Sequence, residues 1–403
     1  MRFKNKKRHL LRQLVRRVRA RLRRGMMDRM TVLAVTGSAG KTSASHYLYR
    51  VLSAHHRCHS GIDFNDENAV IRSMLKASSD HSHYVQEVSG HLPGQLRRVL
   101  PLIRHRIGIV TSVGLDHYRA FRSREKVAEE KSNMVRLLPP DGVAVLNADD
   151  ELVAAMAEVA PCRVITFGRH GNADLRASDI ESQWPQRLSF TLHWQGDSLR
   201  LETQLFGDLM LHCVLAAVAG GLAVGLSLQQ CVAPLQRVEA ISRRASVHRT
   251  RAKQWLIDDT FKASYWTIQQ IMERVDAVRA PRKTLCFGSF SDTAGADSDK
   301  YRQTANRALK IADRVVFCGI KATYIPKMMK PELEGRLFAF EDIEEASRFL
   351  QADVVEDELI YLKSSGMEHL ERLIMAAEKE VKCWKQKCPL LIHCQNCDES
   401  GWK

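Results

Sequence analysis

The chain has 403 residues, a formal net charge of +15, 45% apolar residues and 27% charged residues. This composition excludes a disordered or fibrous protein, and the length predicts two or three domains, each with its own core. No apolar run reaches the roughly 20 residues of a membrane-spanning helix, and the N-terminus lacks the apolar core and cleavage site of a secretion signal. We therefore expect an intracellular, cytoplasmic protein.

The positive charge is concentrated at the start of the chain. Residues 2–24 hold twelve Lys or Arg and no acid, which leaves about +3 for the rest, so the charge does not make the folded body a nucleic-acid binder. Within residues 1–27, apolar residues recur at helical spacing and Arg fills the other face, which predicts a basic amphipathic helix. Its apolar residues are Leu10, Leu11, Leu14, Val15, Val18 and Leu22.

This helix has several alternative roles. A basic amphipathic helix can lie on an anionic membrane surface, which would make the protein peripheral at the inner face of the membrane. It can also bind a partner protein or pack on the body of the chain. Nucleic acid is the least favoured partner of residues 2–24, because Phe3 is their only aromatic residue for base stacking.

Residues 28–237 are predicted to form one α/β domain. The β-branched run at 31–35 predicts a strand, and the segment after residue 42 predicts a helix. Further strands alternate with helical stretches, which is typical of a mostly parallel sheet. The remaining predicted elements are strands at 84–88, 106–113, 143–147 and 164–167, a hairpin of 188–194 with 199–204, and a buried helix at 211–224.

A second α/β series begins near residue 240 and predicts a Rossmann-like C-terminal domain over residues 238–380. Its predicted strands are 254–257, 284–287, 314–318 and 359–362, and its predicted helices are 265–278, 300–312 and 367–382. The fold class is therefore α/β, with a nucleotide-binding central domain of mostly parallel sheet followed by a second α/β domain.

Residues 381–403 form a cysteine-rich tail that contains Cys383, Cys388, Cys394 and Cys397. One Cys-x2-Cys pair is present, but four residues separate the other two cysteines, whereas structural zinc often uses two close pairs. The alternatives are a zinc site made by these four residues and a flexible, reduced tail. The other six cysteines are scattered singly, as small core residues usually are.

The strongest local signal is the segment Gly37–Thr42, Gly-Ser-Ala-Gly-Lys-Thr, between the first strand and the first helix. Successive backbone N–H groups there can surround phosphate oxygens, and the helix N-terminus adds partial positive charge. Lys41 would reach the β- and γ-phosphates of ATP, and Thr42 would place a hydroxyl on Mg²⁺. Val35 stands where the usual phosphate-binding loop has its first Gly, so the pattern is a shortened form.

This shortened loop resembles that of the Mur ligase family, and further family motifs follow it in the family's order. Within the family the chain resembles the MurF type, which adds D-alanyl-D-alanine, and the resemblance covers roughly residues 30–375. The matching segments are Gln86–Gly90, Ser112–His117, Val127–Met134, Asn147–Asp150, Leu256–Ala263, Phe287–Asp292 and Leu362–Ser365.

The resemblance implies a magnesium site made by Thr42, Glu87, His117 and Lys131. Magnesium prefers oxygen ligands, so the family's carbamylated lysine would present an oxygen anion where an ammonium would repel the metal. Taken singly, these acid, imidazole and ammonium groups would more often be ordinary solvated side chains; their order along the chain supports the site. The implied catalytic residues are Lys41, Glu87, His117, Lys131 and Lys262.

The resemblance also implies a nucleotide site for ATP. Asp258 would lie near the ribose or the phosphates and Lys262 near the γ-phosphate. Arg244 would contact the nucleotide, with Arg243 as the alternative register. The implied nucleotide-binding residues are Gly37, Ser38, Ala39, Gly40, Lys41, Thr42, Ser43, Asn147, Asp149, Arg244 and Asp258.

Two departures from the family pattern concern the acid substrate and the nucleotide. Only about 30 residues precede the loop strand, so we expect no UDP-binding N-terminal domain and an acid substrate that is not carried on UDP. The family's adenine-contacting His and Asn are replaced at Leu209, Met210 and Cys213. Base selection would then fall to other residues, such as Asn147 and Asp149.

A third departure concerns the amine substrate. Ser264-Tyr265 and Ser289 stand where the family has Asn-Pro and Asp, at positions where the amine would dock. This difference implies a different amine acceptor on an unchanged fold.

The function implied by the resemblance is an ATP- and Mg²⁺-dependent ligase that joins a small-molecule carboxylate to an amine, with an amino acid or peptide as substrate. One alternative is a degenerate nucleotide-binding partner or scaffold subunit, which the substituted adenine motif favours. The other is a true D-Ala-D-Ala-adding peptidoglycan ligase, which the missing UDP-binding domain disfavours.

Overall fold

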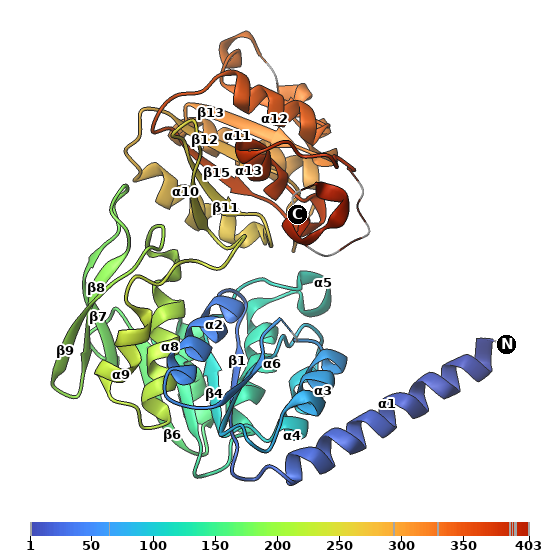
Figure 1. Ribbon diagram of the computed structural model, residues 1–403, viewed down its shortest axis with the longest axis vertical. Helices are drawn as coiled ribbons and strands as arrows, with labels where there is room; N and C mark the ends of the chain where they lie inside the picture. The colour runs from blue at the N-terminus through green and yellow to red at the C-terminus, as the bar shows by residue number, and fades with distance from the viewer. Residues whose placement is uncertain are drawn as a thin grey trace. The chain divides into compact units, whose positions relative to one another are not determined.

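The computed structural model describes residues 2–63, 65–292, 295–328, 330–386, 388, 390 and 393–401, and for residues 2–13 it describes the backbone alone. The chain divides into two compact units, each an α/β structure (Figure 1). Unit 1 comprises residues 1–180, 189–203 and 210–238, and unit 2 comprises residues 181–188, 204–209 and 239–403.

The main boundary lies after Val238, one residue from the predicted position, but two short segments depart from the predicted domains. Residues 181–188 and 204–209 belong to unit 2. Aromatic packing explains this assignment, because the Trp184 ring lies 5.5 Å from that of Phe206 and 5.2 Å from that of Trp255, centroid to centroid.

Unit 1 contains a nine-stranded sheet in the order β2-β3-β1-β4-β5-β6-β7-β8-β9. The pairs from β2 to β7 are parallel, and β8 and β9 form the predicted antiparallel hairpin. The strands are β1 Thr31–Thr36, β2 Cys58–Gly61, β3 His83–Glu87, β4 Ile107–Val110, β5 Val143–Asn147, β6 Arg163–Gly168, β7 Leu175–Glu181, β8 Ser189–Trp194 and β9 Asp197–Glu202.

Helices cover both faces of this sheet. Successive residues of a strand point to opposite faces. On β4, Ile109 packs against Gly220 of α8, whereas the neighbouring Gly108 faces Met134 of α6. The helices of unit 1 are α1 Arg2–Gly25, α2 Lys41–Ser53, α3 Glu67–Lys76, α4 Gln95–Ile103, α5 Tyr118–Phe121, α6 Arg124–Arg136, α7 Glu151–Ala154, α8 Leu211–Ala223 and α9 Leu228–Val232.

Unit 2 contains a six-stranded sheet in the order β10-β11-β15-β12-β13-β14, parallel except for the β10–β11 pair. The strands are β10 Ser246–Arg249, β11 Trp255–Asp259, β12 Lys283–Phe287, β13 Arg314–Cys318, β14 Leu337–Phe340 and β15 Leu359–Lys363. The helices are α10 Ile268–Asp276, α11 Asp297–Ile311, α12 Ile343–Ala352 and α13 Glu371–Glu378.

The predicted α/β class with mostly parallel sheets is confirmed in both units. The predicted helix at 367–382 is wrong in its bounds, because α13 begins at Glu371 after His369 adopts a left-handed backbone conformation with φ of 54°. Among the described residues, no helix has the length and apolar character needed to cross a membrane.

Candidate functional site

The loop between β1 and α2 follows a path that only glycine allows at two positions. Gly37 has a φ of +153° and Gly40 a φ of +78°. A Cβ on Gly37 would lie 1.9 Å from Thr111 Oγ1, and a Cβ on Gly40 would lie 2.8 Å from Cys213 Sγ. The loop backbone therefore packs closely on β4 and α8, and its last residue opens α2 as the sequence predicts.

Thr42 and Glu87 meet at the end of this loop, and the Lys41 side chain turns back onto the loop. In the sheet Val35 lies opposite Glu87, which brings the carboxyl end of β3 beside the loop. The Thr42 hydroxyl donates to Glu87 Oε2 at 3.0 Å, and both residues are buried. Lys41 Nζ donates to the carbonyl of Gly37 at 2.6 Å, so the ammonium lies over the loop.

A second buried group forms around Asp116, on the segment after β4. Ser38 Oγ donates to Asp116 Oδ1 at 2.6 Å. Lys131 Nζ lies 3.7 Å and His117 Nε2 3.6 Å from Asp116 Oδ2. The Asp116 and Lys131 side chains are completely buried, so the glycine loop, the predicted imidazole and the predicted lysine share one carboxylate.

The position of Lys131 is fixed by the helix that carries it. Ser123 caps the start of α6 by accepting from the Lys126 amide. One turn before the end of the predicted motif, the Glu130 carboxylate accepts from the amides of Gly94 and Leu96 at 2.6 and 2.7 Å, at the start of α4. These bonds tie α6 to α4 and leave the next residue, Lys131, directed into the interior.

Asn147 and Asp149 lie at the carboxyl end of β5. Asn147 Nδ2 donates to the Thr111 carbonyl at 2.8 Å, so this amide ties β5 to the end of β4. Asp149 Oδ2 accepts from His212 Nε2 at 2.7 Å and from the Arg169 amide. Burial alone would raise the Asp149 pKa, but the His212 and Arg169 hydrogen bonds outweigh it and lower that pKa.

His212 is a site residue that the sequence analysis did not predict. It lies on α8, within the segment where the family's adenine motif is altered, and 63 residues separate it from Asp149. Cys213, the next residue, donates to the Gly40 carbonyl at 3.6 Å. In the sequence, the sign of this contact was a histidine directly before Cys213, one of the altered positions.

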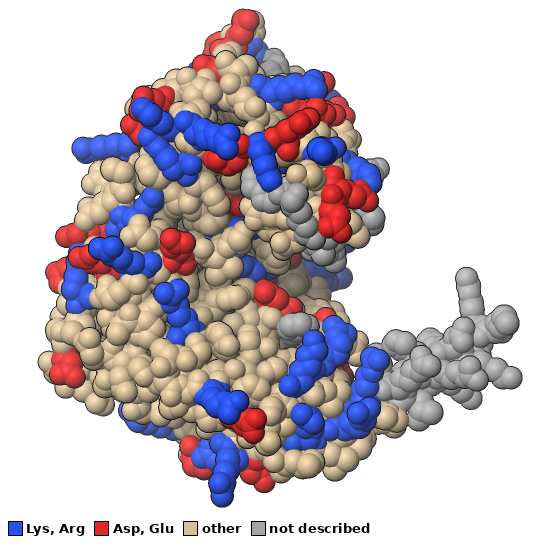
Figure 2. Space-filling model, in the orientation of Figure 1, with Lys and Arg blue, Asp and Glu red and all other residues tan. Residues whose placement is uncertain are grey.

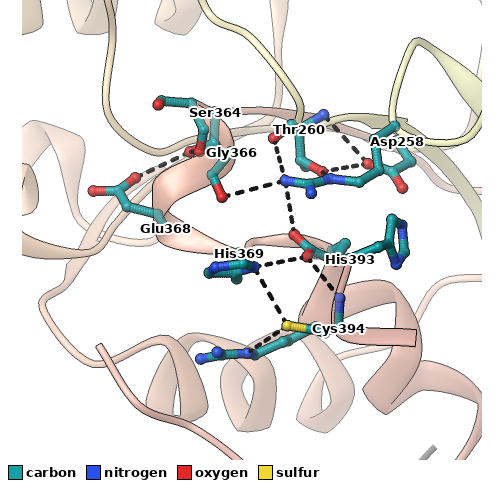
Figure 3. Close-up of polar contacts among 12 residues, drawn as sticks. Asp258, Thr260, Ser364, Gly366, Glu368, His369, His393 and Cys394 are labelled. Atoms are coloured by element: carbon teal, nitrogen blue, oxygen red, sulfur yellow. Dashed lines mark hydrogen bonds and ion pairs between the residues drawn. The ribbon is translucent and has the colours of Figure 1, made fainter. Parts of the chain in front are cut away.

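In unit 2, Asp258 lies at the end of β11 in a buried polar network (Figure 3). Its Oδ1 accepts from the Thr260 hydroxyl at 2.7 Å. Burial raises the pKa of the Asp258 carboxyl to about 7, even though the Thr260 hydrogen bond acts in the opposite direction. The neighbouring Asp259 instead forms an ion pair with Lys363 Nζ at 2.6 Å.

The two alternative arginine registers have different environments. Arg243 is buried: its guanidinium donates to the Thr260 carbonyl at 2.8 Å and pairs with Glu371 Oε2 at 3.1 Å. Arg244 is half-buried, and its guanidinium lies over the Phe261 ring, 4.2 Å from the centroid. Arg243 is therefore engaged inside unit 2. Lys262 was predicted to lie near the γ-phosphate. In the structure its Nζ lies 3.4 Å from Asp292 Oδ2.

The comparisons with known proteins agree with this geometry. Residues 35–221 match the family model described as the Mur ligase middle domain. Residues 35–221 therefore form a Mur ligase middle domain. Over 237 residues it is 30% identical to UDP-N-acetylmuramoyl-tripeptide–D-alanyl-D-alanine ligase of Mycobacterium tuberculosis, covering 58% of this chain and 46% of that protein. The ligase of the same name from Bacillus subtilis is 22% identical over 347 residues, covering 85% and 75%.

Solved structures of Mur ligases share the fold. A crystal structure of MurF from Acinetobacter baumannii matches with a TM-score of 0.80 and 24% identity, covering 91% of this chain and 80% of that one. MurF from Thermotoga maritima in complex with ADP matches with a TM-score of 0.77 and 20% identity, covering 91% and 84%. The chain spans about half the length of the first curated relatives that it matches.

Among the described residues of the tail, the four cysteines do not come together as the predicted group. Within the described part of the chain, the residues that come together as a ligand group are His369, Glu371 and Cys394, without the other tail cysteines. Cys394 Sγ accepts from Arg372 Nε at 3.3 Å, and burial raises the pKa of this thiol to about 11. The predicted group of four cysteines is therefore replaced in the structure by a cluster with one tail cysteine, Cys394.

A pH-dependent stability follows from Asp258. Because its folded pKa of about 7 exceeds the ordinary value of 3.8, the folded protein holds a proton that the unfolded chain loses, and stability falls as pH rises from about 4 to about 7. We expect Asp258→Asn to raise the free energy of unfolding at pH 8 by on the order of 3 kcal/mol. Urea unfolding at pH 4 and pH 8 measures the effect.

At pH 4 the same substitution should change stability little. Asp276→Asn, at an exposed acid of α10, is the control and should change neither value. Equal effects of Asp258→Asn at the two pH values would contradict the raised pKa.

Proposed function

We propose that this protein is a member of the Mur ligase family and an ATP-dependent carboxylate–amine ligase that releases ADP and phosphate. The observation that carries the proposal is the contact at the glycine loop between the Thr42 hydroxyl and the Glu87 carboxylate, 3.0 Å apart, with Lys41 Nζ on the Gly37 carbonyl of the same loop. The loop has two positions that require glycine, a lysine and a helix N-terminus. This combination is suited to binding a nucleoside triphosphate.

The residues present fit magnesium. Thr42 and Glu87 offer a hydroxyl and a carboxylate, the hard oxygen ligands that Mg²⁺ takes, and both are buried. These two residues would hold the ion, with His117 and a carbamylated Lys131 beside a second position. Bound Mg²⁺ would offset the charge of the ATP phosphates, and Lys41 would add positive charge at the same phosphates.

The proposed reaction has two balanced steps. A carboxylate oxygen of the acid substrate bonds to the γ-phosphorus of ATP while the bond to the β-phosphate oxygen breaks, which gives an acyl phosphate and ADP. The amine nitrogen then bonds to the acyl carbon, phosphate leaves with the bonding electrons, and the amine loses a proton. The loop and Lys41 serve the first step by orienting the γ-phosphate and stabilising the charge on it.

We propose an amino acid or a peptide as substrate. The curated relatives are named for a UDP-N-acetylmuramoyl-tripeptide and D-alanyl-D-alanine, so a D-Ala-D-Ala-adding ligase is the second candidate. A catalytically degenerate scaffold is the third. The contact of Cys213 with the Gly40 carbonyl favours the scaffold, because an apolar thiol occupies the altered adenine motif beside the loop.

An ADP-release assay over pairs of acids and amines tests the proposal. We expect amine-dependent ADP release by the wild-type chain, and we expect Lys41→Ala and Glu87→Ala to abolish it, since each removes a group at the phosphates. Lys76→Ala, at an exposed lysine of α3, is the control and should retain activity. Wild-type protein that binds ATP but never releases ADP with any mixture of amino acids and peptides would support the scaffold instead.

A further inference from the structure

Helix α1 is attached to unit 1 by its basic side. Arg24 is buried, and its guanidinium donates to the carbonyls of Ile103 and Met27 at 2.7 and 2.6 Å. Arg23 donates to the carbonyl of Ala77 at 2.6 Å. Ala77 ends α3 and Ile103 ends α4, and the partial negative charge of helix C-termini attracts cations. Arginine therefore faces the body.

This attachment leaves the apolar side of α1 in solvent. Ala20 is completely buried beside the arginine contacts, whereas the residues on the opposite side are exposed. The exposed side chains form an apolar stripe: Leu14 (59% exposed), Val15 (48%), Val18 (47%) and Leu22 (66%). A surface helix normally buries such a stripe in its own domain, so this arrangement is the reverse of the usual one.

Exposed arginines border the stripe on both sides. Successive helical residues are about 100° apart, which puts Arg19 along one border and Arg21 along the other. The whole helix, Arg2–Gly25, contains no acidic residue. Figure 1 shows that the N-terminal part of α1 extends beyond the rest of unit 1. Figure 2 shows several Lys and Arg side chains on the surface where α1 joins unit 1.

We propose that α1 lies in the surface of an anionic lipid bilayer, with the apolar stripe in the acyl-chain boundary and the bordering arginines on lipid phosphates. Charge complementarity selects this occupant. A second copy of α1 would bring two highly basic helices together, and nucleic acid would match the arginines but leave the stripe in water. A bilayer surface matches both the stripe and the arginines, because its acyl chains cover apolar side chains and its phosphates pair with cations. Basic amphipathic helices bind membranes in this way.

Flotation of the full-length protein with vesicles tests the proposal. We expect binding to vesicles of mixed phosphatidylglycerol and phosphatidylcholine, little binding to pure phosphatidylcholine, and a decrease in binding as salt rises. Val18→Ser with Leu22→Ser should abolish binding. Leu92→Ser with Val354→Ser, at exposed apolar residues outside α1, is the matched control and should bind as the wild type does.

The charge contribution is measured separately. Arg19→Gln and Arg21→Gln should each weaken binding to the anionic vesicles roughly fivefold, the fold-change that corresponds to about 1 kcal/mol per cation near the surface. A Val18→Trp variant should show a blue shift of its fluorescence on the anionic vesicles. Circular dichroism and urea unfolding confirm that each variant is folded.

Three results would overturn the proposal. The first is equal binding of the stripe variant and the wild type to anionic vesicles. The second is a dimer of the wild type that the stripe variant loses, with no vesicle binding by either, which would assign the stripe to a second copy. The third is binding of double-stranded DNA by the wild type without binding to vesicles. A failure of the ligase assay would leave this test unaffected, since it measures vesicle binding.

Discussion

Lys131→Ala is expected to lower amine-dependent ADP release by about 10²–10³-fold, the effect of removing one preorganised charged group from a phosphoryl-transfer site. Lys131 is completely buried with its Nζ 3.7 Å from Asp116 Oδ2, and Asp116 also accepts from the Ser38 hydroxyl of the glycine loop. The ADP-release assay measures the loss. Lys126→Ala is the matched control, because Lys126 is an exposed lysine on the same helix.

Chemical rescue of Lys131→Ala separates the two forms of this lysine. If Lys131 is carbamylated, a small carboxylate such as acetate should restore part of the activity, because it can occupy the space of the carbamate oxygens. If Lys131 acts as an ammonium, methylammonium should restore activity and acetate should not. Retention of full activity by Lys131→Ala in a folded protein would remove this lysine from the proposed site.

Arg243→Met is expected to lower the free energy of unfolding of the protein by about 3–5 kcal/mol. The substitution leaves Glu371 buried without the guanidinium that lies 3.1 Å from it, and it also removes a donor from Thr260. Urea unfolding measures the change. Arg244→Met is the matched control, because Arg244 is half-buried over the Phe261 ring, and it should cost less than about 1 kcal/mol.

The pair of arginine variants also separates stability from nucleotide binding. Arg244→Met should weaken ATP binding if this register contacts the nucleotide, with stability unchanged. Arg243→Met combined with Glu371→Met should recover part of the lost stability, since the buried charge that caused the loss is removed. Equal destabilisation by the two single arginine variants would contradict the environments that distinguish them.

The sequence predicted the parts of the fold that have strong local patterns. The strand at Thr31–Thr36 and the helix at Leu211–Ala223 are clear because each is almost entirely apolar. Strands such as β2 and β10 were not predicted, because Cys58–Gly61 and Ser246–Arg249 are four residues long and mostly polar. Their strand conformation comes from pairing with a neighbouring strand, which no local pattern records.

The candidate site shows the same contrast between features with a local sequence pattern and features that depend on distant segments. Lys41 and Thr42 are predictable because the glycine loop is continuous in sequence, and Glu87 was predicted only through a family motif. Contacts between distant segments were not predictable: His212 is 63 residues from Asp149. The burial that raises the Asp258 pKa depends equally on packing between elements that are distant in the chain.

The division of the chain between its two units has a consequence for synthesis on the ribosome. The chain passes from one unit to the other five times, after Ile180, Leu188, Thr203, Leu209 and Val238. Trp184 therefore leaves the ribosome well before Trp255, the ring it packs against. Unit 1 can complete its sheet by residue 238. The two early segments of unit 2 remain exposed to solvent until the rest of that unit has been synthesised. A fragment that ends at Val238 would keep the Trp184 and Phe206 rings without their partners from the rest of unit 2, so aggregation is expected to follow its early release.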